Sequence, residues 1–353
     1  MSKRIARELH IGNLVIGGGR LPVLQSMCNT DTRDIAATAA QMVRLEQAGC
    51  QIIRVAVPDL EAAAAIAKLK QCTSMPIVAD IHFDYRLALA AAEAGADKIR
   101  INPGNIGEKK NIKAVADCCR QRGIPIRIGV NGGSVDRDLK EKYGVCADTL
   151  YLSAKRNLEA LEEFDFRDIC ISVKASDVFT TVRCYRMLAE SCDYPLHLGV
   201  TEAGSPEMGA LKSAAAFGGL LCDGIGDTFR VSLTADPVEE IYAAKKILKA
   251  LDLNEGGVTV ISCPTCGRTQ VDLIPIAREV EGRLAHVTAK LKVAVMGCAV
   301  NGPGEASDAD VGIACGKGEG LIIRKGQVLR KVPEDKLADE LVLEVEKLIG
   351  ENA

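Results

Sequence analysis

The sequence predicts an α/β protein, a (β/α)8 TIM barrel followed by a small α+β domain, and three observations support this prediction. From Leu21 to about Leu251, short β-branched runs alternate with Ala-rich helical stretches, and a Gly-rich segment then introduces a different pattern. Alternating strands and helices form parallel sheets with right-handed crossovers. Eight such units in about 230 residues match the usual size of a (β/α)8 barrel.

The eight expected barrel strands are short apolar runs bounded by Pro, Gly or polar residues. They cover residues 22–26, 51–55, 76–80, 98–102, 125–129, 170–174, 196–200 and 228–232. Ile169 is assigned to the turn before the sixth strand, and the glycines at 17–19 are expected to turn a hairpin in a short N-terminal flap. An open doubly wound sheet is the runner-up, but no Gly-x-Gly-x-x-Gly motif follows the first strand.

Helical stretches separate these strands, for example at residues 34–47, 60–71 and 237–250. Four glycines are placed to end helices: Gly49, Gly95, Gly123 and Gly224. A linker at 253–257 then divides a barrel domain, residues 1–252, from a second domain, residues 258–353. In the second domain we expect strands at 258–262, 285–296, 311–315 and 321–324, and helices at 272–283 and 336–349.

Composition and charge exclude several classes of protein. Aromatic residues make up 3% of the chain and the formal net charge is -3, so we expect no nucleic-acid partner, because such domains are usually basic. No stretch reaches the roughly 20 apolar residues of a membrane span, and the chain starts without the apolar core of a secretory signal. We therefore expect a cytoplasmic protein without a membrane partner, whose 14 cysteines are reduced thiols.

Two cysteine motifs stand out near the end of the chain. Cys263 and Cys266 form a C-x-x-C pair, and Cys298 lies 32 residues further on, close to Glu305. Iron–sulfur clusters are normally held by four thiolates. Three thiolates and a carboxylate would leave one iron open to substrate, as on catalytic metals. A structural zinc ribbon, or a C-x-x-C pair without metal, is the alternative, and Cys315 is a rival fourth ligand.

Positive charges interrupt the expected barrel strands, although parallel strands covered on both faces are normally apolar. Four arginines and one lysine interrupt five strands in the same manner: Arg54, Arg100, Arg127, Lys174 and Arg230. A guanidinium keeps its proton inside a protein, and a buried unpaired charge costs several kcal/mol, so the group needs an anion. Arginine binds phosphate through two parallel hydrogen bonds, which favours a polyanionic substrate such as a diphosphate. Taken singly, each arginine could instead form a structural ion pair.

Further polar residues are expected at the C-terminal strand ends, where TIM-barrel active sites lie. Asp80 and His82 follow the third strand, and Glu202 follows the seventh. We choose Glu202 as the catalytic acid/base carboxylate, with a counter-ion role as its alternative. His82 and Asp80 are further catalytic candidates, with His82 as a proton donor or substrate ligand. The neutral candidates for substrate binding are Asn102, Asn131, Thr201 and Ser232.

Together these residues resemble those of the 4-hydroxy-3-methylbut-2-enyl diphosphate synthase (IspG/GcpE) family. The matching stretches run through nearly the whole chain: 78–86, 100–107, 126–131, 172–177, 199–204, 263–268 and 297–305. So many long matches in order are far more specific than a lone C-x-x-C pair. The chain has no large insertion between its two domains, which resembles the short bacterial form of the family.

The resemblance implies an iron–sulfur oxidoreductase of the non-mevalonate (MEP) isoprenoid pathway. Its implied cofactor is a [4Fe-4S] cluster held by Cys263, Cys266, Cys298 and Glu305, whereas Cys315 is not part of the family pattern. The implied reaction opens the ring of 2-C-methyl-D-erythritol 2,4-cyclodiphosphate and removes a hydroxyl, giving 4-hydroxy-3-methylbut-2-enyl diphosphate. The implied partners are flavodoxin or ferredoxin as electron donor, and a second copy of the chain in a homodimer.

Two other interpretations of the same features remain. A phosphate-binding TIM-barrel lyase or transferase with a structural zinc domain would need no redox centre. An iron–sulfur sensor that binds a nucleic acid or a protein is the non-enzymatic alternative, and the acidic composition counts against it.

Overall fold

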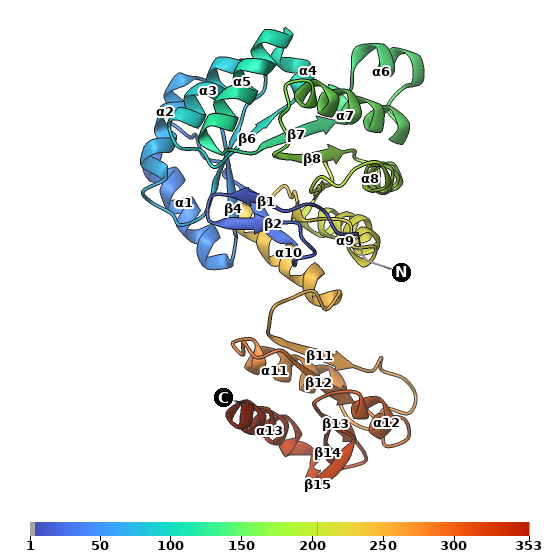
Figure 1. The fold of residues 1–353 in the computed structure, drawn as a ribbon. Helices are drawn as coiled ribbons and strands as arrows, with labels where there is room; N and C mark the ends of the chain where they lie inside the picture. The colour runs from blue at the N-terminus through green and yellow to red at the C-terminus, as the bar shows by residue number, and fades with distance from the viewer. Residues whose placement is uncertain (1–3, 203, 353) are drawn as a thin grey trace. The chain divides into compact units, whose positions relative to one another are not determined.

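The barrel predicted from the sequence is present in the computed structural model, which describes residues 4–202 and 204–352 (Figure 1). Eight parallel strands are hydrogen-bonded in the order β8-β7-β6-β5-β4-β3-β10-β9. A bridge between Ile171 and Leu196 joins β8 to β9 and so closes the ring. The strands are β3 (Val23–Met27), β4 (Ile52–Ala56), β5 (Ile77–Asp80), β6 (Lys98–Ile101), β7 (Ile126–Asn131), β8 (Ile169–Lys174), β9 (His197–Gly199) and β10 (Thr228–Arg230).

Helices follow the strands and surround the barrel (Figure 1). They are α1 (Ile35–Ala48), α2 (Leu60–Leu69), α3 (Tyr85–Glu93), α4 (Pro103–Ile106), α5 (Lys109–Arg122), α6 (Arg137–Tyr143), α7 (Ala147–Glu162), α8 (Val178–Ser191), α9 (Pro206–Cys222) and α10 (Pro237–Ala250). Their apolar faces pack against the outward-facing strand residues in one continuous core. The four glycines expected to end helices all adopt positive φ, between 65° at Gly123 and 95° at Gly49, a conformation that glycine takes without steric cost.

A short hairpin precedes the barrel, made of β1 (Leu9–Ile11) and β2 (Leu14–Ile16). Its two-residue turn contains Gly12, with φ of 57°. The hairpin turn predicted at residues 17–19 was therefore wrong, because those glycines form a separate turn after β2. Ile169 was also wrongly left in a turn, because it pairs with Ile126 as the first residue of β8. The apolar side of the hairpin packs on the barrel residues Val23, Ile52, Val78 and Cys170. It therefore closes the N-terminal end of the barrel.

Residues Asn254–Ala353 form a second compact unit, built on a sheet in the order β11-β12-β13-β14-β15. The strands are β11 (Val258–Ser262), β12 (Leu291–Met296), β13 (Val311–Cys315), β14 (Glu319–Arg324) and β15 (Gln327–Pro333), and the helices are α11 (Leu273–Leu284), α12 (Gly302–Ser307) and α13 (Leu337–Asn352). β11, β12 and β13 are parallel, and β14 and β15 are antiparallel additions.

Two expectations for this unit need correction. The strand predicted at 285–296 begins only at Leu291, because α11 and the turn after it occupy the preceding residues. β15 was not predicted because most of its side chains are exposed and form no apolar run. Among the described residues, no helix combines the length and apolar character needed to cross a membrane.

Candidate active site

A cavity of about 360 Å³ lies at the C-terminal ends of the barrel strands. Ten predicted site residues line it: Arg54, Asp80, His82, Arg100, Arg127, Asn131, Lys174, Thr201, Arg230 and Ser232. Met27, Gly129 and Ser172 complete the lining. The parallel barrel brings these residues together because all its strands end on the same face.

Asp80, at the end of β5, is the carboxylate partner of two cavity arginines. Its Oδ1 accepts a hydrogen bond from Arg100 Nη1 at 2.9 Å, and its Oδ2 lies 3.7 Å from Arg54 Nε. Burial alone would raise the pKa of Asp80, but the charges of Arg54 and Arg100 outweigh burial and hold that pKa well below its usual range. A carboxyl group that stays ionised cannot donate a proton at neutral pH. The geometry therefore favours a counter-ion role for Asp80. His82 Nε2 lies 3.8 Å from Asp80 Oδ2, and the His82 side chain is 57% exposed.

Glu240 is a site residue that the sequence analysis did not identify. It lies in the first turn of α10 and is buried. Its Oε2 accepts from Arg230 Nε at 2.8 Å and its Oε1 accepts from Arg230 Nη2 at 2.7 Å. Ser26 donates to the same carboxylate at 2.9 Å. The only sequence signal was an acidic residue in the helix that follows an arginine-bearing strand.

Two glycines in the barrel strands make room for the long cationic side chains. A Cβ atom on Gly129 would overlap the guanidinium of Arg100, and one on Gly199 would overlap the end of Lys174. Glycine weakens a strand interior and is found where another group must approach closely. Gly129 and Gly199 thus let Arg100 and Lys174 cross the neighbouring strands to reach the cavity.

Positive charge exceeds negative charge around the cavity. Desolvation, together with the charges of Arg54 and Arg127, lowers the pKa of Lys174 well below the ordinary lysine value. Desolvation also lowers the pKa of Arg127, to about 10, so Arg127 keeps its proton at neutral pH. Among the described residues, the carboxylates that form ion pairs with the cavity arginines are Asp80 and Glu240. The cavity therefore favours an anionic ligand.

A second hollow, of about 560 Å³, adjoins the cavity and shares Asn131 and Thr201 with it. Glu202 lines this hollow and not the cavity itself. Its φ of 53° is uncommon for a residue other than glycine and is a conformation often kept at functional sites. Asn102 lines neither space. Its Oδ1 accepts from Gly104 N at 3.1 Å and caps α4, so the structure engages this amide in shaping the loop.

The predicted metal ligands gather at one edge of the C-terminal sheet. Cys263 follows β11 and Cys298 follows β12, and these strands are parallel neighbours. Gly297 N donates to Cys263 Sγ at 3.2 Å, which ties the two loops together. The charge of Arg268 interacts with Cys266, Cys298 and Glu305, so the remaining candidates share one neighbourhood.

The thiols at this edge differ in their electrostatic environment. Backbone and side-chain hydrogen bonds from Arg268 lower the pKa of Cys266, and backbone hydrogen bonds, first from Asn301, lower that of Cys298. Burial instead raises the pKa of Cys315 to about 12. Cys315 ends β13 and packs in the apolar core of this unit. Thiolates are the ligands of metals, so Cys266 and Cys298 are better prepared to bind iron than Cys315.

Three thiols and one carboxylate are a donor set that is compatible with an iron–sulfur cluster. Among the described residues, no group of three His, Cys, Asp or Glu side chains is close enough to hold one ion. A tetrahedral zinc site needs four ligands directed at one point. A four-iron cluster binds its protein ligands on separate irons, so the ligands stand apart. Cys263 and Cys298 follow neighbouring parallel strands, so their loops lie side by side.

Fold and site together define a TIM barrel with an arginine-lined cavity, joined to a second domain that carries a C-x-x-C pair. Residues 6–245 match the GcpE TIM-barrel domain and residues 259–347 match the GcpE protein C-terminal domain. The chain therefore belongs to the GcpE family. The family and the barrel fold expected from the sequence are both confirmed.

Curated relatives are similar to this chain over nearly its whole length. The chain is 54% identical over 348 residues to the 4-hydroxy-3-methylbut-2-en-1-yl diphosphate synthase (flavodoxin) of Anoxybacillus flavithermus, covering 98% of this chain and 96% of that protein. The enzyme of the same name from Bacillus mycoides is also 54% identical, over 98% of this chain and 95% of that protein. These relatives confirm the predicted enzyme class, whereas the zinc-containing lyase or transferase was the wrong alternative.

Among solved structures, the dihydropteroate synthase of Stenotrophomonas maltophilia matches with a TM-score of 0.54 and 18% identity, over 70% of this chain and 98% of that chain. This likeness concerns the barrel fold alone.

Proposed function

We propose that the chain catalyses the reductive ring opening and dehydroxylation of 2-C-methyl-D-erythritol 2,4-cyclodiphosphate to 4-hydroxy-3-methylbut-2-en-1-yl diphosphate. The reaction consumes two electrons, breaks the carbon–oxygen bond that closes the ring, and releases the hydroxyl oxygen as water. The names of the curated relatives support the product. The cationic cavity supports a cyclic diphosphate as the substrate.

One observation carries the proposal: four arginines and one lysine from different barrel strands line a single cavity, namely Arg54, Arg100, Arg127, Arg230 and Lys174. Each guanidinium can make two parallel hydrogen bonds to a phosphate group. Asn131, Thr201 and Ser232 add neutral donors at the rim. Fixing the diphosphate at several points holds the carbon skeleton in one orientation, which supplies the entropic part of catalysis.

The acid and base roles follow from the charges around the carboxylates. Asp80 holds Arg54 and Arg100 in place and stays ionised. We assign proton delivery to Glu202 or His82, which are exposed at the hollow and at the cavity respectively. Either group can give the proton that the departing hydroxyl needs to leave as water.

We assign Cys263, Cys266, Cys298 and Glu305 as the residues that would hold a [4Fe-4S] cluster. A bound cluster would supply single electrons and a Lewis-acidic iron. The loops after β11 and β12 present the three thiols, and α12 presents the carboxylate. Carboxylate is a weaker ligand for cluster iron than thiolate, so Glu305 is the donor that can be exchanged.

Partners and compartment complete the proposal. The names of the relatives specify flavodoxin, so we propose flavodoxin as the electron donor, with ferredoxin as the alternative. We also propose a homodimer, which light scattering would detect as twice the mass of one chain.

The cysteines support a cytoplasmic location. Fourteen free thiols suit a reducing compartment such as the cytoplasm.

The central test is turnover by iron-loaded protein under anaerobic conditions. With reduced flavodoxin, the cyclodiphosphate should be converted to a linear diphosphate of the expected mass. Arg127→Met should weaken binding of the cyclodiphosphate by about tenfold or more, since one charged contact is worth at least 1.4 kcal/mol. Arg137→Met is the matched control, because the Arg137 side chain is 92% exposed. Loaded protein that binds the cyclodiphosphate but forms no product would refute the assignment.

A further inference from the structure

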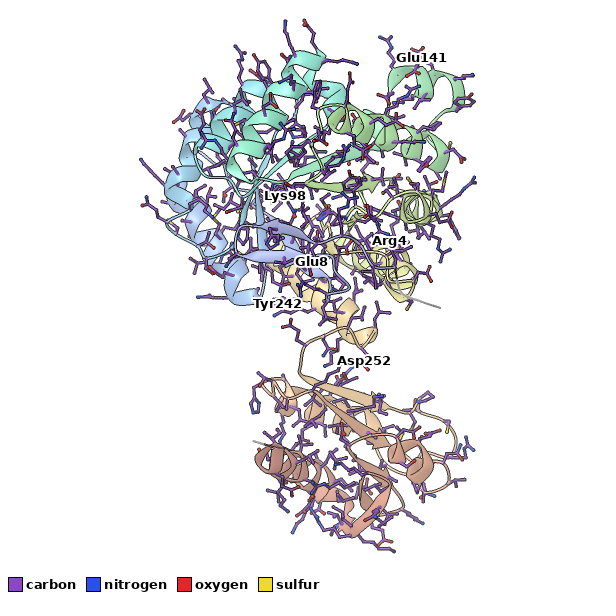
Figure 2. All side chains as sticks on the ribbon, viewed as in Figure 1. Arg4, Glu8, Lys98, Glu141, Tyr242 and Asp252 are labelled. Atoms are coloured by element: carbon purple, nitrogen blue, oxygen red, sulfur yellow. The ribbon has the colours of Figure 1, made fainter. Side chains whose placement is uncertain are left out.

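The barrel interior below the cavity contains polar side chains where TIM barrels normally pack branched apolar ones. Alternation along the strands turns Gln25, Lys98, Arg127 and His197 inward from β3, β6, β7 and β9. Each is at most 1% exposed, and Lys98 is seen among the barrel strands (Figure 2). The layer beneath is apolar and is covered by the N-terminal hairpin.

These four residues lack hydrogen-bond partners to an unusual degree. Twelve buried side-chain nitrogen and oxygen atoms have no partner within the described part of the chain. Half of them belong to this layer: both amide atoms of Gln25, Nζ of Lys98, Nε and Nη1 of Arg127, and Nε2 of His197. Buried polar groups are almost always hydrogen-bonded, so such a concentration indicates a bound water or ion.

The charge of the layer distinguishes an anion from water alone. Arg127 is a cation, and desolvation lowers the pKa of Lys98 to about 7, so Lys98 is partly protonated at neutral pH. A bound anion beside Lys98 would raise that pKa and favour the ammonium form. Cys170 faces Lys98, but burial raises the pKa of its thiol, so it supplies no negative charge. Asp80 is already paired with Arg54 and Arg100 in the layer above. An unpaired buried charge is costly, and no carboxylate in the described residues forms an ion pair with Lys98 or Arg127.

We propose that this layer holds a small monovalent anion of the halide class, bound between Lys98 and Arg127, with Gln25 and His197 as further donors. The Nδ1 atom of His197 is hydrogen-bonded to Thr228. In the tautomer whose Nδ1 accepts a hydrogen bond from the Thr228 hydroxyl, Nε2 is protonated. That Nε2–H group can then donate a hydrogen bond to the anion.

We choose a single-atom anion because it needs the least room among the close-packed side chains of the barrel interior. The hairpin covers the barrel end below this layer, and Arg127 also lines the cavity above it. We expect phosphate and organic anions to bind in that cavity. The anion would neutralise the buried charge under the substrate site whether or not a diphosphate is bound.

Anomalous diffraction from crystals of the anaerobically prepared full chain, soaked in bromide, tests the position directly. We expect a bromide peak in contact with both Lys98 Nζ and Arg127. Ordered water alone at that position, or bromide only in the cavity beside Lys174 and Arg230, would overturn the proposal.

Calorimetry in solution gives an independent test. Replacing potassium gluconate by potassium bromide at constant ionic strength should raise the Tm of the barrel by roughly 2–5 °C at a bromide concentration about ten times the dissociation constant.

Lys98→Met should abolish this rise in Tm. Lys110→Met, which removes a lysine that is 75% exposed, should retain it. Lys174→Met should also retain it, since Lys174 belongs to the cavity. A shift lost in Lys174→Met but kept in Lys98→Met would place the anion in the cavity and refute the proposal. That outcome would leave the proposed reaction intact.

Discussion

Glu240 binds the guanidinium of Arg230 through both of its carboxylate oxygens, so a buried residue of α10 determines where a cavity arginine points. The pair uses Nε and Nη2 of Arg230, which leaves Nη1 on the side of Met27, a cavity residue. A side chain that carries no substrate contact of its own can therefore control how one phosphate-binding group is presented. We describe Glu240 as a positioning residue.

Glu240→Gln should raise KM for the cyclodiphosphate by about tenfold while changing kcat little. The variant keeps one acceptor oxygen but loses the negative charge that fixes Arg230. The contact of Arg230 with the diphosphate is made in both the ground state and the transition state, so weakening it raises KM. The measurement is steady-state kinetics under anaerobic conditions. Glu239→Gln is the matched control, because Glu239 is the exposed neighbour on the same helix. Equal KM values for the two variants would show that Arg230 does not depend on Glu240.

Gly199→Ala should weaken substrate binding without unfolding the barrel. The added methyl group overlaps the end of Lys174, which must then leave its position across β9. Because the flexible end of the Lys174 side chain can move, the substitution should lower the affinity for substrate and leave the free energy of unfolding nearly unchanged. We expect the dissociation constant to rise by about tenfold, or 1.4 kcal/mol, in calorimetric titration. Gly218→Ala serves as the control, since a Cβ there meets open space. Equally tight binding by both variants would contradict the role assigned to Gly199.

Much of the barrel could be predicted from sequence because its signals are local. β-branched runs, Ala-rich helices and helix-ending glycines each depend on a few adjacent residues, and the strand cations appeared at regular places in that pattern. Gly129, Gly199 and Glu240 could not be found in this way. Their importance comes from a side chain on another strand or helix, and no local pattern records that neighbour. Asn102 shows the converse, since its place at a strand end suggested substrate contact although its amide caps α4.

Binding of the cyclodiphosphate should be accompanied by proton uptake at Lys174. Desolvation and the surrounding arginines lower the pKa of Lys174 in the free cavity, and the negative charge of the ligand must raise it again. Affinity should therefore be greatest below the free-state pKa and should fall as the pH rises from that value to the bound-state pKa.

Calorimetric titration in two buffers with different ionisation enthalpies measures this uptake. Lys174→Met should remove most of it, whereas Lys212→Met, in α9, should leave it unchanged. Identical binding enthalpies in both buffers across the pH range would count against a titrating Lys174.

Glu202→Gln should lower kcat by about a hundredfold or more, the usual size of a general acid contribution. The substitution keeps the shape and removes the proton, so binding of the cyclodiphosphate should change little. His82→Gln tests the other candidate in the same assay. If Glu202→Gln turns over at the wild-type rate and His82→Gln does not, proton delivery belongs to His82. Wild-type rates in both variants would exclude the two residues together.

Cys315→Ser should leave the iron content of anaerobically reconstituted protein unchanged, whereas Cys298→Ser should lose most of it. Cys315 is fully buried in the apolar core of the C-terminal unit, and Cys298 lies on the loop after β12 beside Gly297, whose amide contacts Cys263. Glu305→Ala should retain iron but alter the spectrum of the cluster, because a weak fourth ligand is replaced by solvent. Iron analysis with visible and electron paramagnetic resonance spectra separates these cases. A large loss of iron in Cys315→Ser, with Glu305→Ala unchanged in both iron and spectrum, would make Cys315 the fourth ligand in place of Glu305.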